Sequence, residues 1–230
     1  LLDIGGESTR PGAAPVTESE ELDRVAPVLE ALSARIDAVY SIDTSNAGVI
    51  SECARLGAGL INDVRALQRP GALQAAAASG LPVCLMHMQG EPGTMQLAPH
   101  YDDVAGDIVA WLQQRIGVCT AAGIGKERLL VDPGFGFGKT FDHNLELLDA
   151  LDRFSALECP LLIGLSRKRM LGTITGKPEK GRVAAGLAAA VIGVMKGARI
   201  VRTHDVAETV DALQVCRHLQ QLRQPVTTRL

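Results

Sequence analysis

The chain has 230 residues, of which 47% are hydrophobic and 21% charged, a composition typical of one globular domain with a substantial core. The formal net charge of −3 excludes the bulk basic character that points to nucleic acid or an acidic membrane, so any anion site must be local. The longest uncharged apolar run, residues 183–195, is shorter than the ~20 residues of a membrane span, and five scattered cysteines are typical of reduced, buried thiols in a cytosolic protein.

Short aliphatic segments that end on a polar residue alternate with helical patterns through the first half of the chain. Strands are expected at 1–4, 39–44, 60–64 and 82–87. A turn-rich loop, 5–12, precedes a helix that begins at the Thr17–Glu20 capping box and that Pro27 should kink. Further helices are expected at 46–57, at 71–79 and, after a long loop, at about 102–121.

The most informative stretch is LLVDPGFGFGK at 129–139, where a strand ends on Asp132. Pro133 cannot continue a central strand, and three alternate glycines then predict a flexible turn that spaces two phenylalanines. Asp142 offers an N-cap for the helix that follows. The order is therefore strand, acid, glycine loop, helix.

The second half repeats this order. A strand is expected at 160–166, leading into Arg167–Arg169, and a buried helix at 182–195. A last strand is expected at 199–205 and an amphipathic helix at 206–223, with apolar positions Val210, Leu213, Val215 and Leu219.

Seven strands that each precede a helix predict an α/β fold, either a (β/α)₈ barrel or a doubly wound sheet. Polar groups end all the strands and no strand leads into a G-x-G-x-x-G loop, which favours the barrel. Seven strands cannot close an eight-stranded barrel. We therefore expect residues 1–230 to be a single but N-terminally incomplete barrel domain whose first strand and loop lie upstream of Leu1, and to be inactive or poorly folded alone.

Polar residues at the strand ends are the candidates for chemistry. They are Asp43, Asn62, His87, Asp132, Lys168, Arg202 and His204. Arg202 and His204 share a face of the last strand, where barrels commonly bind phosphate; the alternative is a salt bridge to Asp205 or another neighbour. Thr9 and Arg10 are further candidates for anion binding.

Asp43, Asn62 and Asp132 predict an opposite, acidic patch. Such groups are costly to desolvate unless something pairs with them, and a flat ligand edge with adjacent N–H donors would satisfy both acids. The alternative for any one acid is a Lys or Arg from a neighbouring strand.

Two nucleotide-related patterns fail. Residues 133–140 would match the P-loop G-x-x-x-x-G-K-[ST] if position 133 were Gly, but it is Pro. The Arg167–Arg169 run is too short for a nucleic-acid site, and we expect one of its residues to point into the rim and the others to be solvated.

In this order, the blocks resemble the dihydropteroate synthase family of pterin-binding barrels, from the first residue to about Arg223. They are DIGGESTRPG (3–12), SIDTS (41–45), IND (61–63), LMHMQG (85–90), DPGFGFGK (132–139), GLSRK (164–168) and RTHD (202–205). The resemblance implies a cytoplasmic transferase of folate biosynthesis, a target of sulfonamides, that joins 6-hydroxymethyl-7,8-dihydropterin pyrophosphate to 4-aminobenzoate. The products are 7,8-dihydropteroate and pyrophosphate.

The resemblance also implies residue roles. The pterin would be held by Asp43, Asn62, Asp132 and Lys168; the pyrophosphate by Thr9, Arg10, Arg202 and His204; and the aminobenzoate by Pro11, Phe137 and Ser166. Asp43, Lys168, Arg202 and His204 would be the catalytic residues. Mg²⁺ would mask the pyrophosphate charge, but its expected Asn ligand lies upstream of Leu1, so no residue of 1–230 is expected to bind it.

The family's implied mechanism ionises the C–O bond to pyrophosphate first, so the site needs electrostatic stabilisation rather than a strong base. The family usually forms homodimers, and helix 184–195 is a candidate for that contact. No nucleic acid or membrane partner is expected. Two alternatives are a pterin-binding methyltransferase barrel, which needs no pyrophosphate site, and a non-catalytic paralogue that binds a pterin.

Overall fold

The computed structural model describes residues 1–10 and 12–223. Seven short strands run through them: β1 Leu2–Gly5, β2 Tyr40–Asp43, β3 Leu60–Asp63, β4 Val83–Met86, β5 Leu129–Asp132, β6 Leu162–Ile163 and β7 Ile200–Val201. The helices between and after them are α1 Glu18–Ser33, α2 Ala47–Arg55, α3 Ala72–Ser79, α4 Val104–Ala121, α5 Phe141–Asp149, α6 Arg169–Thr175, α7 Val183–Met195 and α8 Val206–Arg223. Single 3₁₀ segments lie at Lys126–Arg128, Leu151–Leu157 and Glu179–Gly181.

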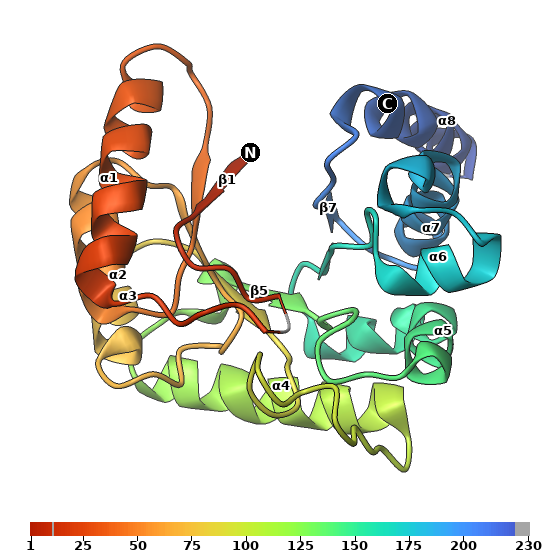
Figure 1. Ribbon diagram of the computed structural model, residues 1–230, viewed down its shortest axis with the longest axis horizontal. Helices are drawn as coiled ribbons and strands as arrows, with labels where there is room; N and C mark the ends of the chain where they lie inside the picture. Colours follow the sequence, from red (N-terminus) through yellow and green to blue (C-terminus); the bar gives the residue numbers. More distant parts are fainter. Residues whose placement is uncertain (11, 224–230) are drawn as a thin grey trace, which may run out of the picture.

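All strand pairs are parallel, and spatial neighbours follow chain order. Strands β1 to β5 form one sheet, β6 and β7 a second, and one bridge from Val131 to Leu161 joins the two. A doubly wound sheet would reverse this order at a switch point, whereas a barrel does not. The predicted seven strands and the barrel class are therefore confirmed, and β1 and β7 lie at the two ends of the curved array (Figure 1).

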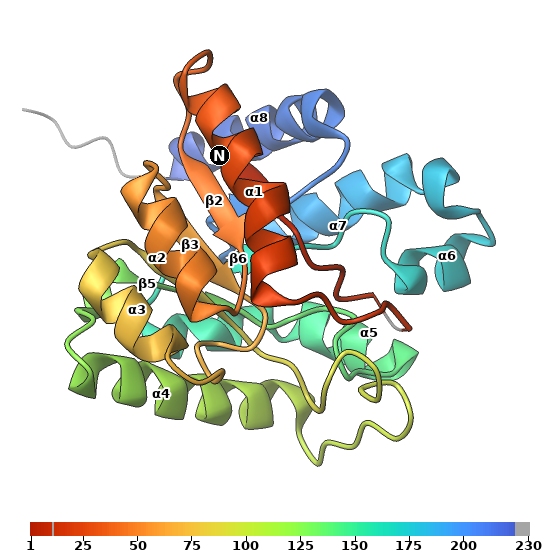
Figure 2. The same cartoon turned by 60° about the vertical axis from the view of Figure 1, so that its left-hand side comes forward.

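Helices cover the outside of the strands, and the core lies between the two. Helices α1, α2 and α3 pack side by side, α4 runs below β5, and α6, α7 and α8 gather beside β7 (Figures 1 and 2). The larger core cluster includes Ile61, Leu85 and Leu112, and a smaller one under α1 includes Leu29 and Ile42. Strands β2 to β4 are almost wholly buried, as parallel strands covered on both faces should be.

Two helix starts differ from the predictions. Thr140, not Asp142, caps α5, because its side chain accepts from the His143 backbone N–H and the His143 ring accepts in return. Asn46 precedes α2 as predicted but does not cap it; its amide instead bonds to Glu21 and Arg69. The Thr17–Glu20 capping box is confirmed, and α1 continues through Pro27.

The last two long helices are less buried than their sequences predict. Only Ala189, Ala190 and Gly193 of α7 are buried, because one narrow face meets β6 and α8. The apolar positions of α8 predicted to face the core are largely exposed, among them Val215 and Leu219. Within the described residues, none of the helices combines the length and the apolarity that crossing a bilayer requires.

Candidate active site

The C-terminal ends of the strands form a polar cup. Register places Gly5, Asp43, Asn62 and Cys84 side by side on successive strands, with Asp132 two residues above the partner of Cys84. Residues paired in parallel register project to the same side of the sheet. The acids and the amide predicted from the sequence therefore face the same space.

Arg202 spans the open side of this cup. Its Nε donates to Asp3 Oδ2 at 2.6 Å, and its Nη2 lies 3.5 Å from Asp43 Oδ2. The Asn62 amide is 3.5 Å from the same Asp3 oxygen. The guanidinium thus connects β7 to β1 and β2, and the cation of the last strand faces the acids of the first strands.

Burial makes the carboxylates of the cup weak acids. Desolvation, reinforced by the Asp3 charge, raises the pKa of Asp43 to about 7, although Arg202 opposes the shift. Desolvation also raises the pKa of Asp132, against the backbone N–H of Gly134 that donates to its Oδ1 at 2.7 Å. No ion pair within 4.0 Å reaches Asp132 from the described residues. Both acids would be satisfied by a ligand that brings N–H donors.

Lys168 supplies a second cation at the floor of the cup. Its Nζ lies 4.5 Å from the centroid of the Phe137 ring, a cation–π contact. Burial lowers the pKa of Lys168 to about 8, while the neighbouring Asp132 charge raises it. Lys168 therefore couples the acid at the end of β5 to the aromatic ring on the glycine loop.

Ser166 and His204 form a polar pair beside Arg202. The His204 backbone N–H donates to Ser166 Oγ at 3.2 Å, and the His204 Nδ1 lies 3.0 Å from the same oxygen. Burial and the charges of Arg167 and Arg202 lower the pKa of His204, so the ring is neutral at pH 7. Asp205 pairs with Arg167 at 2.7 Å, so it is not the partner of Arg202 or His204, and Arg167 is not simply solvated.

The loop after β1 is held by a largely buried ion pair at Glu7 and is exposed at Arg10. Glu7 pairs with Arg65 at 3.2 Å, and each side chain is only 10% exposed. Thr9 is half-buried, whereas Arg10 is exposed and lies 3.8 Å from Glu179 rather than in the cup. Pro11, predicted on the aminobenzoate side, lies outside the described residues.

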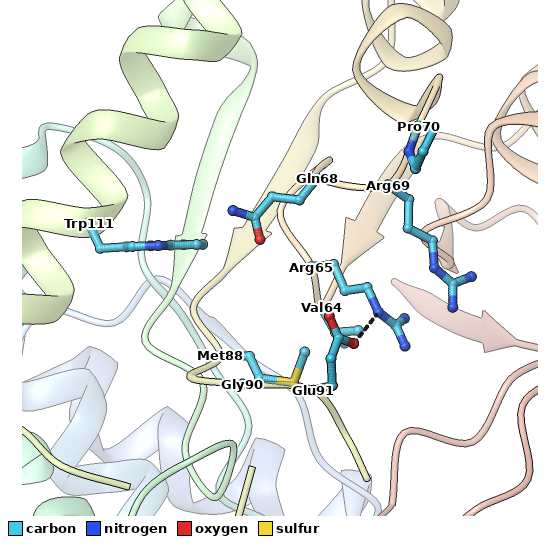
Figure 3. Close-up of a pocket in the computed structure, with 9 residues that line it drawn as sticks. All are labelled: Val64, Arg65, Gln68, Arg69, Pro70, Met88, Gly90, Glu91 and Trp111. Carbon is cyan, nitrogen blue, oxygen red and sulfur yellow. Dashed lines mark hydrogen bonds and ion pairs between the residues drawn. The ribbon is translucent and has the colours of Figure 1, made fainter. Parts of the chain in front are cut away.

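A cavity of about 260 Å³ lies outside the cup, between the loops that follow β3 and β4 and helix α4 (Figure 3). Its lining residues are Val64, Arg65, Gln68, Arg69, Pro70, Met88, Gly90, Glu91 and Trp111. None of them is a predicted site residue. Arg65 reaches from this cavity to Glu91 at 3.3 Å and to Glu7, so the cavity borders the anchor of the β1 loop.

Two residues at the site were not predicted from the sequence, and a third was placed wrongly. Asp3 was expected only to lie in the DIGGESTRPG block, yet its carboxylate accepts a hydrogen bond from Arg202, 199 residues further along the chain. Lys139, the lysine of the incomplete P-loop pattern, is buried within the glycine loop. His87, grouped with the rim residues, is buried against the Trp111 edge instead of facing the cup. Only the period-2 alternation of residues 3 and 5 hinted at Asp3.

No group of three or more His, Cys, Asp or Glu side chains in residues 1–10 and 12–223 is arranged to hold a metal ion. The charged groups of the cup are instead the acids Asp3, Asp43 and Asp132 beside Arg202 and Lys168.

Comparison with known proteins agrees with this geometry. The family model described as "Pterin binding enzyme" matches residues 1–204. The dihydropteroate synthase of Escherichia coli K12 is 54% identical over 94% of this chain and 76% of its own length.

Solved structures of such enzymes superpose closely. The chain has a TM-score of 0.94 and 57% identity to the dihydropteroate synthase of Yersinia pestis in complex with a sulfonamide drug, covering 95% of this chain and 80% of that one. The Xanthomonas albilineans enzyme with 4-aminobenzoic acid gives a TM-score of 0.91 and 50% identity, covering 97% and 80%. The chain therefore belongs to the dihydropteroate synthase family of pterin-binding transferases.

Proposed function

We propose that the strand-end cup, working as a single pterin-binding barrel domain, condenses 6-hydroxymethyl-7,8-dihydropterin pyrophosphate with 4-aminobenzoate. The products are 7,8-dihydropteroate and pyrophosphate. The observation that carries the proposal is the position of Arg202, a cation held at the same mouth as Asp43, Asp132 and Lys168. One site then holds both the acids that can accept hydrogen bonds from a flat, N–H-rich ring and the cation that can stabilise a leaving anion.

Asp132, Asn62, Asp43 and Lys168 bind the pterin in this proposal. One oxygen of Asp132 already accepts from Gly134, and the other remains for the guanidine-like edge of the ring. A ligand that donates two parallel N–H bonds to a buried carboxylate stabilises its charged form, which burial alone disfavours. Because such a ligand would offset the desolvation cost of the Asp132 carboxylate, the buried acid supports binding of a heterocycle of the pterin type.

Arg202 and His204 face the departing pyrophosphate, with Thr9 from the β1 loop. Arg10, which lies 3.8 Å from Glu179, would have to leave that contact to join them. Breaking the C–O bond leaves a pterin methyl cation, with the electron pair going to the pyrophosphate oxygen. Asp43 then faces the developing positive charge, and Arg202 the developing negative charge. The arylamine nitrogen of aminobenzoate attacks the cation and afterwards loses a proton to solvent. The mechanism needs no general base beside that nitrogen.

Phe137, Ser166 and Pro11 form the aminobenzoate side. The Phe137 ring over Lys168 supports this assignment, because it offers an aromatic face next to the reacting end of the pterin. The X. albilineans relative was solved with 4-aminobenzoic acid and the Y. pestis relative with a sulfonamide drug. We propose that this chain takes both classes of ligand.

Mg²⁺ accompanies the pyrophosphate in this proposal, bound mainly by substrate oxygens. A cytoplasmic location is supported by five free thiols, four of them buried. A homodimer is supported by exposed apolar side chains on α7 and α8, including Ile192, Met195 and Val215.

Calorimetry of the full-length protein with the pterin pyrophosphate, with and without Mg²⁺, together with a dihydropteroate formation assay, tests the proposal. We expect Mg²⁺-dependent tight binding and turnover, and loss of both in Asp132→Asn. Binding that ignores Mg²⁺ and the pyrophosphate group would indicate a methyltransferase-like barrel. Tight binding without turnover would indicate a non-catalytic paralogue. Either result would overturn the proposal.

A further inference from the structure

Lys139 is a buried cation that the proposed chemistry does not use. Its side chain is 3% exposed, and its Nζ lies 3.0 Å from His87 Nδ1, from the Gly134 carbonyl oxygen and from the Phe137 carbonyl oxygen. An ammonium has three N–H donors and no acceptor, so these three contacts use all of them. No donor remains for a phosphate, and the resemblance of this stretch to a P-loop does not extend to its lysine.

His87 is suited to be the third acceptor. Burial and the neighbouring Lys139 charge lower the pKa of His87 to about 2, so the ring is neutral. Burial also lowers the pKa of Lys139 to about 7. When Lys139 is charged, its ammonium only donates, so Nδ1 accepts and the ring proton sits on Nε2. The ring is also held in place by the edge of Trp111, at 5.0 Å between centroids. The acceptor is therefore fixed by strand β4 and helix α4 rather than by the glycine loop.

Other side chains bind the rest of the glycine loop, defined here as residues 134–138. Gln96 donates to the Gly136 carbonyl at 2.6 Å, Tyr101 to the Gly138 carbonyl at 2.8 Å, and Asn144 accepts from the Gly136 N–H at 2.7 Å. Within residues 1–10 and 12–223, Lys139 is the only residue that bonds to the carbonyl of Phe137, the residue whose ring faces Lys168.

We propose that Lys139, held by neutral His87, is a positioning residue that sets the Phe137 ring for the aminobenzoate. The inference rests on the function proposed above and adds to it a specificity role for a buried pair outside the cup. Removing the ammonium frees the carbonyl oxygens of Phe137 and Gly134, whereas the Gly134 N–H keeps its bond to Asp132. The effect should therefore fall on the arylamine side more than on the pterin side.

Steady-state kinetics of Lys139→Met in the full-length enzyme tests this. We expect the KM for 4-aminobenzoate to rise about tenfold, as loss of a charged hydrogen bond allows, and the KM for the pterin pyrophosphate to stay within about twofold. Leu112→Ala, a buried α4 side chain, is the matched control. It should lower Tm while leaving both KM values unchanged. Equal changes in both KM values, or a Tm loss without any KM change, would overturn the inference.

A second variant and a second measurement keep the test decisive. His87→Gln retains an acceptor and should keep a near-normal KM for aminobenzoate, whereas His87→Leu should reproduce part of the Lys139→Met effect. Amide hydrogen exchange at residues 137 and 138 should accelerate in Lys139→Met but not in β3. Hydrogen exchange can be measured without turnover, so the two proposals can fail separately. Absence of dihydropteroate synthesis would refute the proposed function. Unchanged exchange at residues 137 and 138 would refute the positioning role of Lys139.

Discussion

Asp43 is in an unfavourable electrostatic environment. Its carboxylate is desolvated by burial and shares the cup with Asp3, and its nearest cation is the half-exposed Arg202. A group arranged for a ligand's positive charge commonly lowers the stability of the free protein. Replacing the Asp43 carboxylate by a neutral group should therefore stabilise the fold.

Asp43→Asn should raise the free energy of unfolding, more at pH 8 than at pH 5. The folded pKa of about 7 lies above the ordinary value of 3.8, so the folded state binds more protons between about pH 4 and about pH 7, and wild-type stability falls as the pH rises through that window. Asn mimics the protonated acid. We expect a gain of about 2 kcal/mol at pH 8.

Urea unfolding at the two pH values measures this gain, and the dihydropteroate assay should show the accompanying loss of turnover. An equal stability change at pH 5 and pH 8 would contradict the assignment of the raised pKa to Asp43.

The loop after β1 illustrates how the elements around the rim are held together. Arg65, from the loop after β3, contacts Glu7, Ser45 and Glu91, which follow β1, β2 and β4. One guanidinium therefore connects four successive strand-end loops. The Glu7 branch is buried, whereas Glu91 is largely exposed.

Arg65→Met should destabilise the protein by about 2 kcal/mol, because Glu7 would lose its nearer cation in a largely buried site. Glu91→Gln, which removes the exposed branch of the same fork, should change stability by less than about 0.5 kcal/mol. Denaturant unfolding compares the two. The KM for pterin pyrophosphate should rise only in Arg65→Met, since Thr9 and Arg10 follow Glu7. An equal loss of unfolding free energy in both variants would show that the buried Arg65–Glu7 pair contributes no more to stability than the exposed Arg65–Glu91 pair.

The positions of the elements were predictable from the sequence, and several contacts between them were not. Aliphatic runs that end on Asp43, Asp63 and Asp132 gave the strands correctly, because buried parallel strands need apolar residues and polar groups gather where the strands end. The α5 cap was misassigned because Thr140 and Asp142 are both good N-cap residues, and only the backbone geometry chooses between them.

At the scale of the whole molecule, the contacts that build the site join residues far apart in the chain. Arg202 meets Asp3 across the two ends of the curved sheet, and no local pattern reports such a pair. The exposure of α7 and α8 was missed for a similar reason: an apolar helix face indicates burial without saying whether the chain itself or a second molecule covers it.

Val215→Lys together with Leu219→Lys should convert the proposed homodimer to monomers, because both side chains are exposed on α8 and charges there are costly to bury. Sedimentation velocity measures the change. Val118→Lys, which changes an exposed apolar side chain on α4, is the control and should leave the assembly intact. A dimer that survives the α8 changes would place the interface elsewhere.

The glycine loop is packed so tightly that a Cβ at Gly134 or Gly138 would overlap the carbonyl oxygens of His87 or Gln89, and both glycines have φ values near +65°. An alanine at either position would therefore displace the backbone of the loop that carries Phe135 and Phe137. A residue exchange in this stretch that leaves the loop conformation intact is possible at the two phenylalanines but not at these two glycines.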